Sequence, residues 1–297
     1  MADERAASRQ AASHGVGLPG ANSDDDFAAC CSDFYASDAV RLLLGDSFHP
    51  GGEDLTRELL ELARVQPGAA LLDAGGGVGT SAELAAREFS CRVSLVDRAA
   101  ANLDRAHDSI ERAGLSHAIA ISQADACALP FPDSAFDVVL CECIFSTFTD
   151  KPAAAAEMLR VLRRGGRLAL SDVTLETAAL PPELETLLAR VACLADAPSQ
   201  RGLTALLEQS GFAVVESRDS SWALTEMAER IRRRLVALKI AGKLGAVDTG
   251  GFDLDEGKRL ADRAMELIED GDVRYVVVIA SPSPDVTATG PLRSAGR

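Results

Sequence analysis

The stretch Leu71-Leu72-Asp73-Ala74-Gly75-Gly76-Gly77-Val78-Gly79-Thr80 decides the fold of this chain. A short apolar run ends at Asp73, glycines follow at alternate positions, and a helical pattern begins at Ser81. This order predicts a buried strand, a tight turn and the first turn of a helix. Glycine lets a backbone approach a ligand closely, and the first amides of a helix have no partner within the helix. The stretch therefore predicts a ligand site at the carboxyl end of a strand.

Strand and helix patterns alternate after this stretch. Strands are expected at Ala70–Asp73, Arg92–Asp97, Ala118–Gln123, Asp137–Cys141 and Arg167–Asp172. Helices are expected between them, at Ser81–Glu88, Ala99–Ala113 and Pro152–Leu162. Such alternation is typical of a doubly wound, mostly parallel α/β sheet, which binds its ligands at the carboxyl ends of the strands.

The rest of the chain is expected to form two tails, an arm and an insert. Residues 1–26 and 281–297 are rich in small and polar residues, which predicts disordered tails. Between them we expect a single domain over 27–280, with a helical N-terminal arm at 27–66. Two further strands, Phe212–Arg218 and Val273–Ala280, enclose a mostly helical insert at 221–270, which we expect to act as a lid.

Composition narrows the class of protein. With 297 residues, 47% of them hydrophobic, the chain can bury the core of one large α/β domain. It has neither an apolar run long enough for a membrane span nor a signal peptide, so we expect a cytoplasmic protein without a membrane partner. The net charge of -15 argues against a nucleic-acid partner, and the odd number of cysteines, 7, argues against a disulfide framework.

Three acidic residues in register carry a family resemblance. The spacing Asp-x-Gly-x-Gly-x-Gly that begins at Asp73 resembles the first motif of class I S-adenosylmethionine (SAM) methyltransferases. Asp97 lies 24 residues later at the end of the next expected strand, and Asp125 follows the third. The segments 129–139 and 160–168 resemble the small-molecule methyltransferase superfamily called type 11. The resemblance implies a Rossmann-like, seven-stranded sheet with an antiparallel last strand, and SAM as cofactor.

The resemblance also implies a role for each residue of the cofactor site. The glycine turn would approach the methionine part of SAM, with Asp73 near its ammonium group; Asp97 would accept hydrogen bonds from the ribose, and Asp125 would hold the adenine amino group. The segment 43–52 resembles one that folds over the cofactor in relatives, although a plain Pro-Gly-Gly turn is an equal alternative. The full expected set is Asp73, Gly75, Gly77, Gly79, Asp97, Arg98, Asp125, Ala126, Cys141, Tyr35 and His49.

The methyl acceptor is expected beside the segment 141–147, which follows the fourth strand and offers sulfur but no evident general base. Cys143 and Cys193 match in position two cysteines of arsenite methyltransferases, which hold trivalent arsenic as substrate. Soft thiolates suit As(III), and its lone pair makes it a nucleophile that needs no base. The resemblance therefore implies that Cys143 and Cys193 are the catalytic residues and the ligands of the arsenic substrate.

The sequence departs from the arsenite methyltransferases in two respects, and three alternative functions stay open. A further family cysteine would fall near Ala82 and is absent, and the insert does not look like that family's C-terminal domain. Cys30 and Cys31 could supply a third sulfur. The acceptor could instead be a carbon, nitrogen or oxygen of an organic metabolite. A NAD-binding oxidoreductase, which Asp125 disfavours, and a non-catalytic SAM-binding protein are further alternatives. A small-molecule substrate is the expected partner, with a thiol reductant or glutathione as a further candidate; the oligomeric state is open.

Overall fold

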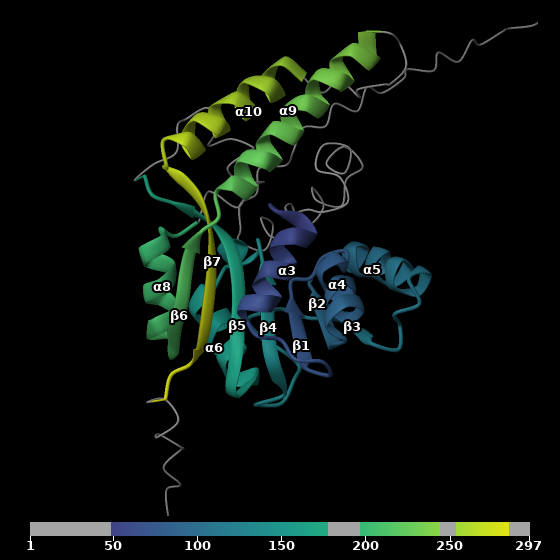
Figure 1. Ribbon diagram of the computed structural model, residues 1–297, viewed down its shortest axis with the longest axis vertical. Helices are drawn as coiled ribbons and strands as arrows, with labels where there is room; N and C mark the ends of the chain where they lie inside the picture. The colour runs from purple at the N-terminus through teal and green to yellow at the C-terminus, as the bar shows by residue number, and fades with distance from the viewer. Residues whose placement is uncertain (1–48, 178–196, 244–253, 285–297) are drawn as a thin grey trace, which may run out of the picture.

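The computed structural model describes residues 49–177, 197–243 and 254–284. Within these ranges the chain forms a seven-stranded sheet with the order β3-β2-β1-β4-β5-β7-β6 (Figure 1). The strands are β1 (Ala70–Ala74), β2 (Arg92–Asp97), β3 (Ile119–Gln123), β4 (Phe136–Glu142), β5 (Leu162–Leu175), β6 (Phe212–Asp219) and β7 (Val273–Pro282). The helices are α3 (Gly52–Leu62), α4 (Thr80–Phe89), α5 (Ala100–Arg112), the 3-10 helix η1 (Phe145–Thr147), α6 (Lys151–Val161), α8 (Gln200–Gln209), α9 (Trp222–Lys243) and α10 (Leu254–Glu269).

The pairing of the strands confirms the predicted fold class. Strands β3, β2, β1, β4 and β5 are parallel to their neighbours, and β7 runs antiparallel to both β5 and β6. The prediction missed the early start of β5, because Leu162 already pairs with Phe136 and so ends the helix before it. The register between β4 and β5 shifts between Phe136 and Val138, because Phe136 pairs with Leu162 and Val138 pairs with Arg167. The extra residues of β5 include Gly165 and Gly166, and Gly165 has a φ of 78°.

Helices cover both faces of the sheet because successive residues of a strand point to opposite faces. On one face Leu71 of β1 packs with apolar residues of α3, α4 and α5, and on the other Leu72 packs with residues of α6 and α8. Both leucines are fully buried. The two layers of helices hold the strands in place. Because β1 to β5 are parallel, their carboxyl ends form one edge of the domain.

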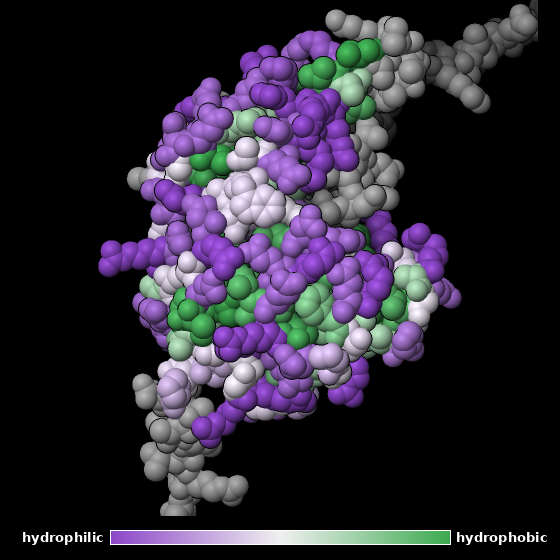
Figure 2. Space-filling model, viewed as in Figure 1, coloured by the Kyte–Doolittle hydropathy of each residue, from purple (hydrophilic) through white to green (hydrophobic). Residues whose placement is uncertain are grey.

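The insert between β6 and β7 consists of α9 and α10, which lie side by side beyond that edge (Figure 1). Figure 2 shows mostly hydrophilic groups on the visible face of this pair, while Val236 and Ile240 of α9 are 44% and 56% exposed. None of the helices in the described ranges combines the length and apolar character needed to cross a membrane. That the insert closes over the site stays a prediction. Of the predicted arm, α3 is helical as expected, and residues 27–48 lie outside the described residues; of the two predicted tails, residues 1–26 and 285–297 do so as well.

Candidate functional site

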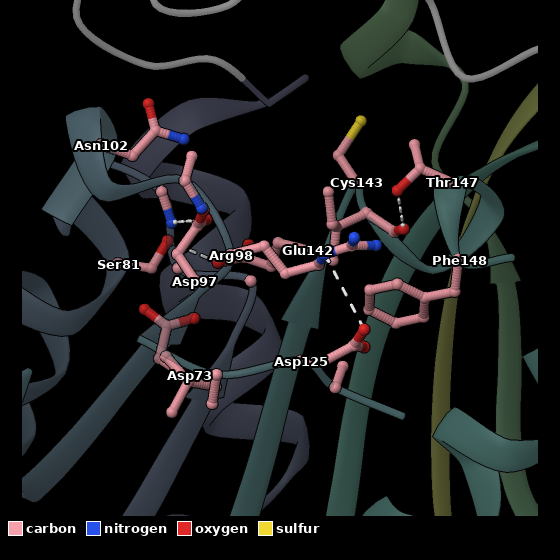
Figure 3. Close-up of a pocket in the computed structure, with 18 of the residues that line it drawn as sticks. Asp73, Ser81, Asp97, Arg98, Asn102, Asp125, Glu142, Cys143, Thr147 and Phe148 are labelled. Carbon is pink, nitrogen blue, oxygen red and sulfur yellow. Dashed lines mark hydrogen bonds and ion pairs between the residues drawn. The ribbon is translucent and has the colours of Figure 1, made fainter. Parts of the chain in front are cut away.

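One pocket opens at the carboxyl edge of the sheet, between the ends of β1, β2, β3 and β4 (Figure 3). It is lined by His49, Asp73, Gly75, Gly76, Gly77, Val78, Thr80, Ser81, Val96, Asp97, Arg98, Ala99, Asn102, Ala124, Asp125, Ala126, Cys127, Glu142, Cys143, Ile144, Thr147, Phe148 and Thr149. Most of the residues predicted for the cofactor site therefore lie on one wall or another of this pocket. The parallel arrangement explains this, since every contributing loop leaves the sheet at the same edge.

The glycine turn after β1 forms the floor of the pocket. The backbone amides of Gly75 and Gly76 donate to the carbonyl oxygen of Val96, at 2.8 and 3.1 Å, which fixes the turn against β2. A Cβ atom on Gly75 would lie 2.9 Å from Cγ2 of Ile144, and one on Gly76 would lie 2.6 Å from Oδ2 of Asp73. The turn therefore has no room for side chains at Gly75 and Gly76, and its backbone stays accessible to a ligand.

Two predicted cofactor residues lie elsewhere than expected. Gly79, with a φ of 87°, does not line the pocket, because it caps the N-terminus of α4 and faces the apolar side chains of Leu95, Ala106 and Ile110. Cys141 is fully buried in the core on the opposite face of the sheet from Glu142, because neighbouring residues of a strand point to opposite faces. The structure corrects both expectations: these residues contribute packing, not pocket wall.

Asp97 and Asp125 sit at the ends of β2 and β3 and are held by nearby backbone amides. Oδ2 of Asp97 accepts a hydrogen bond from the amide of Gly77 at 2.9 Å, and Oδ1 accepts one from that of Ala99 at 2.8 Å. Burial raises the pKa of Asp97. Oδ1 of Asp125 accepts from the amide of Cys127 at 2.8 Å, and Nε of Arg98 lies 3.8 Å from Asp125 Oδ2. Both carboxylates are thus fixed in orientation.

Asp73 is the buried carboxylate of the site, with 2% of its surface exposed. Its Oδ2 has no hydrogen-bond partner among the described residues. Burial raises the pKa of Asp73 well above its usual range, and the neighbouring charges of Glu142 and Asp97 raise it further. A buried carboxylate oxygen without a partner is costly unless a ligand donates to it, so this position fits a cationic group.

Glu142, the last residue of β4, is the pocket carboxylate that the sequence analysis missed. Oε2 of Glu142 accepts a hydrogen bond from Oγ of Ser81 at 2.6 Å, and Oε1 accepts one from Oγ1 of Thr56 at 3.0 Å. Nδ1 of His49 lies 3.9 Å from Oε1. The segment was expected to offer no evident base. Strand alternation could have found this carboxylate, because Asp73 pairs with Leu140 and Glu142 lies two residues further on the same face.

The acceptor side of the pocket is formed by the loop after β4. Cys143 has an unusual φ of 55°, and its amide donates to the carbonyl oxygen of Ser171 at 2.7 Å. Figure 3 shows its thiol directed past the ends of the strands, on the same side of the pocket as Thr147. Cys193, which was predicted for this side, lies outside the described residues, as do Tyr35 of the predicted cofactor set and the pair Cys30 and Cys31.

Comparison with known proteins identifies the family. Residues 72–170 match the family model described as a methyltransferase domain. The chain is 30% identical over 216 residues to the methyltransferase GfsG of Streptomyces halstedii, which covers 66% of this chain and 77% of that protein. We conclude that the chain belongs to the class I SAM-dependent methyltransferases, and SAM is its cofactor.

Further relatives differ in the acceptor that their names state. The ubiquinone/menaquinone biosynthesis C-methyltransferase UbiE of Xanthomonas oryzae is 34% identical over 179 residues, 53% of this chain and 71% of that protein. An arsenite methyltransferase of Halobacterium salinarum is 30% identical over 157 residues, 52% of this chain and 40% of that protein. Among solved structures, phosphoethanolamine N-methyltransferase 2 of Haemonchus contortus, in complex with S-adenosylhomocysteine, has a TM-score of 0.73 at 20% identity, covering 90% of this chain and 61% of that one, which shows the shared fold.

The residues of the pocket fit a cofactor of this kind. SAM is a long, cationic molecule with a ribose and an adenine. The pocket offers a turn without side chains, the buried Asp73 with a partnerless oxygen, and two fixed carboxylates at Asp97 and Asp125. When bound, SAM supplies an electrophilic methyl group whose departure leaves a neutral thioether. The protein's own task is therefore to orient cofactor and acceptor and to exclude water.

Proposed function

We propose that this methyltransferase transfers the methyl group to trivalent arsenic, held by the thiolates of Cys143 and Cys193. The observation that carries the proposal is the place of Cys143, on the wall of the cofactor pocket at the end of β4. The resemblance of Cys193 to the second arsenite-binding cysteine and the relative from Halobacterium salinarum support it. Cys193 itself lies outside the described residues.

In this proposal Asp73, Asp97 and Asp125 bind and orient the cofactor, and Cys143 orients the acceptor. The lone pair of arsenic forms the new bond to the methyl carbon as the bond from carbon to the sulfonium breaks. Arsenic is formally oxidised in this step, so a thiol reductant such as glutathione must return it to the trivalent state. Because the nucleophile is a lone pair, no side chain has to remove a proton.

A second candidate is methyl transfer to an organic metabolite. Glu142 favours it, because a carboxylate with only 4% of its side chain exposed stands in the same pocket and could accept a proton from an acceptor. The relative UbiE, which matches more of its own length than the arsenite enzyme does, supports it as well. Cys143 would then be a wall residue.

The test compares arsenite with a panel of small organic acceptors, using the purified protein, SAM and a thiol reductant. We expect methylated arsenic from the wild type, and none from Cys143→Ser or Cys193→Ser, since each variant leaves arsenic with one protein thiolate. Both variants should bind SAM with unchanged affinity in calorimetry. Cys91→Ser is the matched control, because Cys91 is buried before β2, away from the pocket.

Two results would overturn the arsenic proposal. One is arsenite methylation at the wild-type rate in both Cys143→Ser and Cys193→Ser. The other is a wild-type protein that methylates organic acceptors but not arsenite, which would leave the second candidate in its place. Loss of activity in Cys91→Ser would show that the assay reports folding and not arsenic binding.

A further inference from the structure

The pocket buries more carboxyl groups than its described surroundings pair with cations. Glu142 and Asp73 both point into it from the same face of the sheet, with 4% of the Glu142 side chain and 2% of Asp73 exposed. Within the described ranges neither carboxylate forms an ion pair with a lysine or arginine, and the basic group near Glu142 is the imidazole of His49 at 3.9 Å. Arg98 lies near Asp125 instead. The described lining of the pocket therefore holds more carboxyl groups than cationic groups.

Holding the two hydroxyl groups does not by itself explain a charged residue at position 142. Thr56 of α3 and Ser81 of α4 donate to Glu142 at 3.0 and 2.6 Å. A glutamine at this position could engage the same hydroxyls, because each hydroxyl can donate or accept. Burying a carboxylate costs far more than burying an amide, unless a positive charge compensates it. The charge of Glu142 therefore points to a cationic ligand.

The surroundings of Glu142 make this cost larger. Glu142 and Asp97 both oppose the ionisation of Asp73, whose Oδ2 has no partner among the described residues. Three carboxylates that face one cavity repel one another, and the repulsion is relieved when a cation enters. The cofactor brings two positive charges, the ammonium of its methionine part and the sulfonium.

Glu142 also has a distinctive place among these carboxylates. Asp73 in β1 adjoins the glycine turn, and Asp97 at the end of β2 accepts a hydrogen bond from the amide of Gly77, so both lie next to the turn. Glu142 instead immediately precedes Cys143, at the start of the loop that forms the acceptor side of the pocket. It thus stands between the cofactor side and the acceptor side, where the methyl group has to be transferred.

We propose that Glu142 is the specificity-determining residue by which this site prefers the positively charged cofactor over its neutral product. SAM and S-adenosylhomocysteine differ by one methyl group and one positive charge, and they share every other group. A fixed negative charge near the reacting centre attracts the first and not the second. It therefore favours exchange of the product for a new cofactor after each transfer. The proposal does not depend on the identity of the acceptor.

The experiment measures the dissociation constants of three ligands by calorimetry, for the wild type and for Glu142→Gln. The ligands are SAM, S-adenosylhomocysteine and sinefungin, which carries an amine in place of the sulfonium. In Glu142→Gln the affinity for SAM and sinefungin should fall by roughly thirty- to a hundredfold, the effect of one charge at about 6–8 Å and an effective dielectric constant of about 20. The affinity for S-adenosylhomocysteine should change little.

Two control variants separate charge from structure. Glu61→Gln makes the same change of net charge at an exposed position of α3, and it should leave all three affinities unchanged. Glu142→Asp keeps the charge and should retain most of the preference for SAM. Equal weakening of all three ligands in Glu142→Gln, or no change in any, would overturn the proposal. If that variant does not fold, the wild type still decides, because equal affinities for SAM and S-adenosylhomocysteine would also overturn it.

Discussion

On the side of the pocket formed by β1, β2 and β3, the carboxylates of Asp97 and Asp125 are held by backbone amides of the turns that follow the strands. Asp97 accepts hydrogen bonds from the amide of Ala99, two residues later in the chain, and from that of Gly77 in the neighbouring turn. Asp125 accepts one from the amide of Cys127. On the side formed by β4, the corresponding bonds join distant segments. Glu142 receives its hydrogen bonds from Thr56 on α3 and Ser81 on α4.

The loop that carries Cys143 is held in the same long-range way. The amide of Cys143 donates to the carbonyl oxygen of Ser171 in β5. In the turn that follows, the amide and the hydroxyl of Ser146 both donate to the carboxylate of Asp172, at 2.7 and 2.9 Å. The cofactor side is thus a local structure on a rigid sheet edge. The acceptor side is an assembly of segments, which can vary with the acceptor while the cofactor side stays the same.

The largest effect is expected from Gly76→Ala on the cofactor side. Its Cβ atom would lie 2.6 Å from Oδ2 of Asp73 and 2.8 Å from Cγ of Leu95, so the buried carboxyl group must move. We expect SAM affinity to fall by about a hundredfold or more and the free energy of unfolding to fall by about 1–3 kcal/mol, measured by calorimetry and urea unfolding.

Gly77→Ala is the matched control for this substitution. Its φ is 54°, and nothing lies within 4 Å of an added Cβ atom, so only the backbone conformation opposes it, at about 1–2 kcal/mol. Equal loss of SAM affinity in both variants would show that the turn acts through its backbone alone, and that the carboxyl group of Asp73 is not decisive.

The next largest effect, on ligand affinity, is expected from Asp97→Asn on the cofactor side. Asp97→Asn removes a charged acceptor at the end of β2 but can still accept from the amide of Gly77 or Ala99. We expect SAM and S-adenosylhomocysteine to lose affinity alike, by roughly ten- to a hundredfold, because a hydrogen bond to a charged group contributes about 1.5–3 kcal/mol and both ligands have the ribose. A change confined to SAM would place Asp97 near the sulfonium and contradict the assignment.

On the acceptor side, Asp172→Asn should alter the pH dependence of stability. Asp172 is 1% exposed, and burial raises its pKa to about 6. The unfolded value is about 3.9, so the folded protein holds this proton more tightly. The resulting stabilisation, up to about 3 kcal/mol, is fully present below about pH 4 and is lost as the pH rises through about 6.

Urea unfolding between pH 4 and pH 7 checks this expectation. The asparagine does not titrate, so the variant should lack this loss of stability, and the difference between wild type and variant should shift steadily across the window. Parallel curves for the two proteins would show that Asp172 does not hold a proton in the folded state.

The smallest effect is expected from Thr56→Val, which removes one hydroxyl between α3 and Glu142. We expect a loss of about 1 kcal/mol in stability, faster hydrogen exchange in the α3 amides, and SAM affinity close to that of the wild type, because the charge of Glu142 stays. Mass-spectrometric hydrogen exchange measures the second effect. Unchanged exchange in α3 would mean that this bond does not hold the helix against the pocket.

The sequence by itself determined the cofactor side. The alternation of apolar runs, the glycines after Asp73 and the acidic residues at the next strand ends predicted the fold class, with strand ends correct to within a few residues except at the start of β5. These features are readable because each depends on its neighbours in the chain. A strand needs its own apolar residues, and a tight turn needs its own glycines.

Only the tertiary structure decided which side chains face the pocket beyond that turn. In the structure Glu142 lines the pocket, whereas Cys141 is buried in the core on the other face of the sheet. Gly79 lies where α4 packs against α5. Alternation along β4 separates Glu142 from Cys141, but which face carries the site depends on the helices packed there. Thr56 lies 86 residues from Glu142 in the chain, and their contact exists because the sheet brings α3 over the end of β4. Such contacts arise from packing between distant segments, which no local pattern specifies.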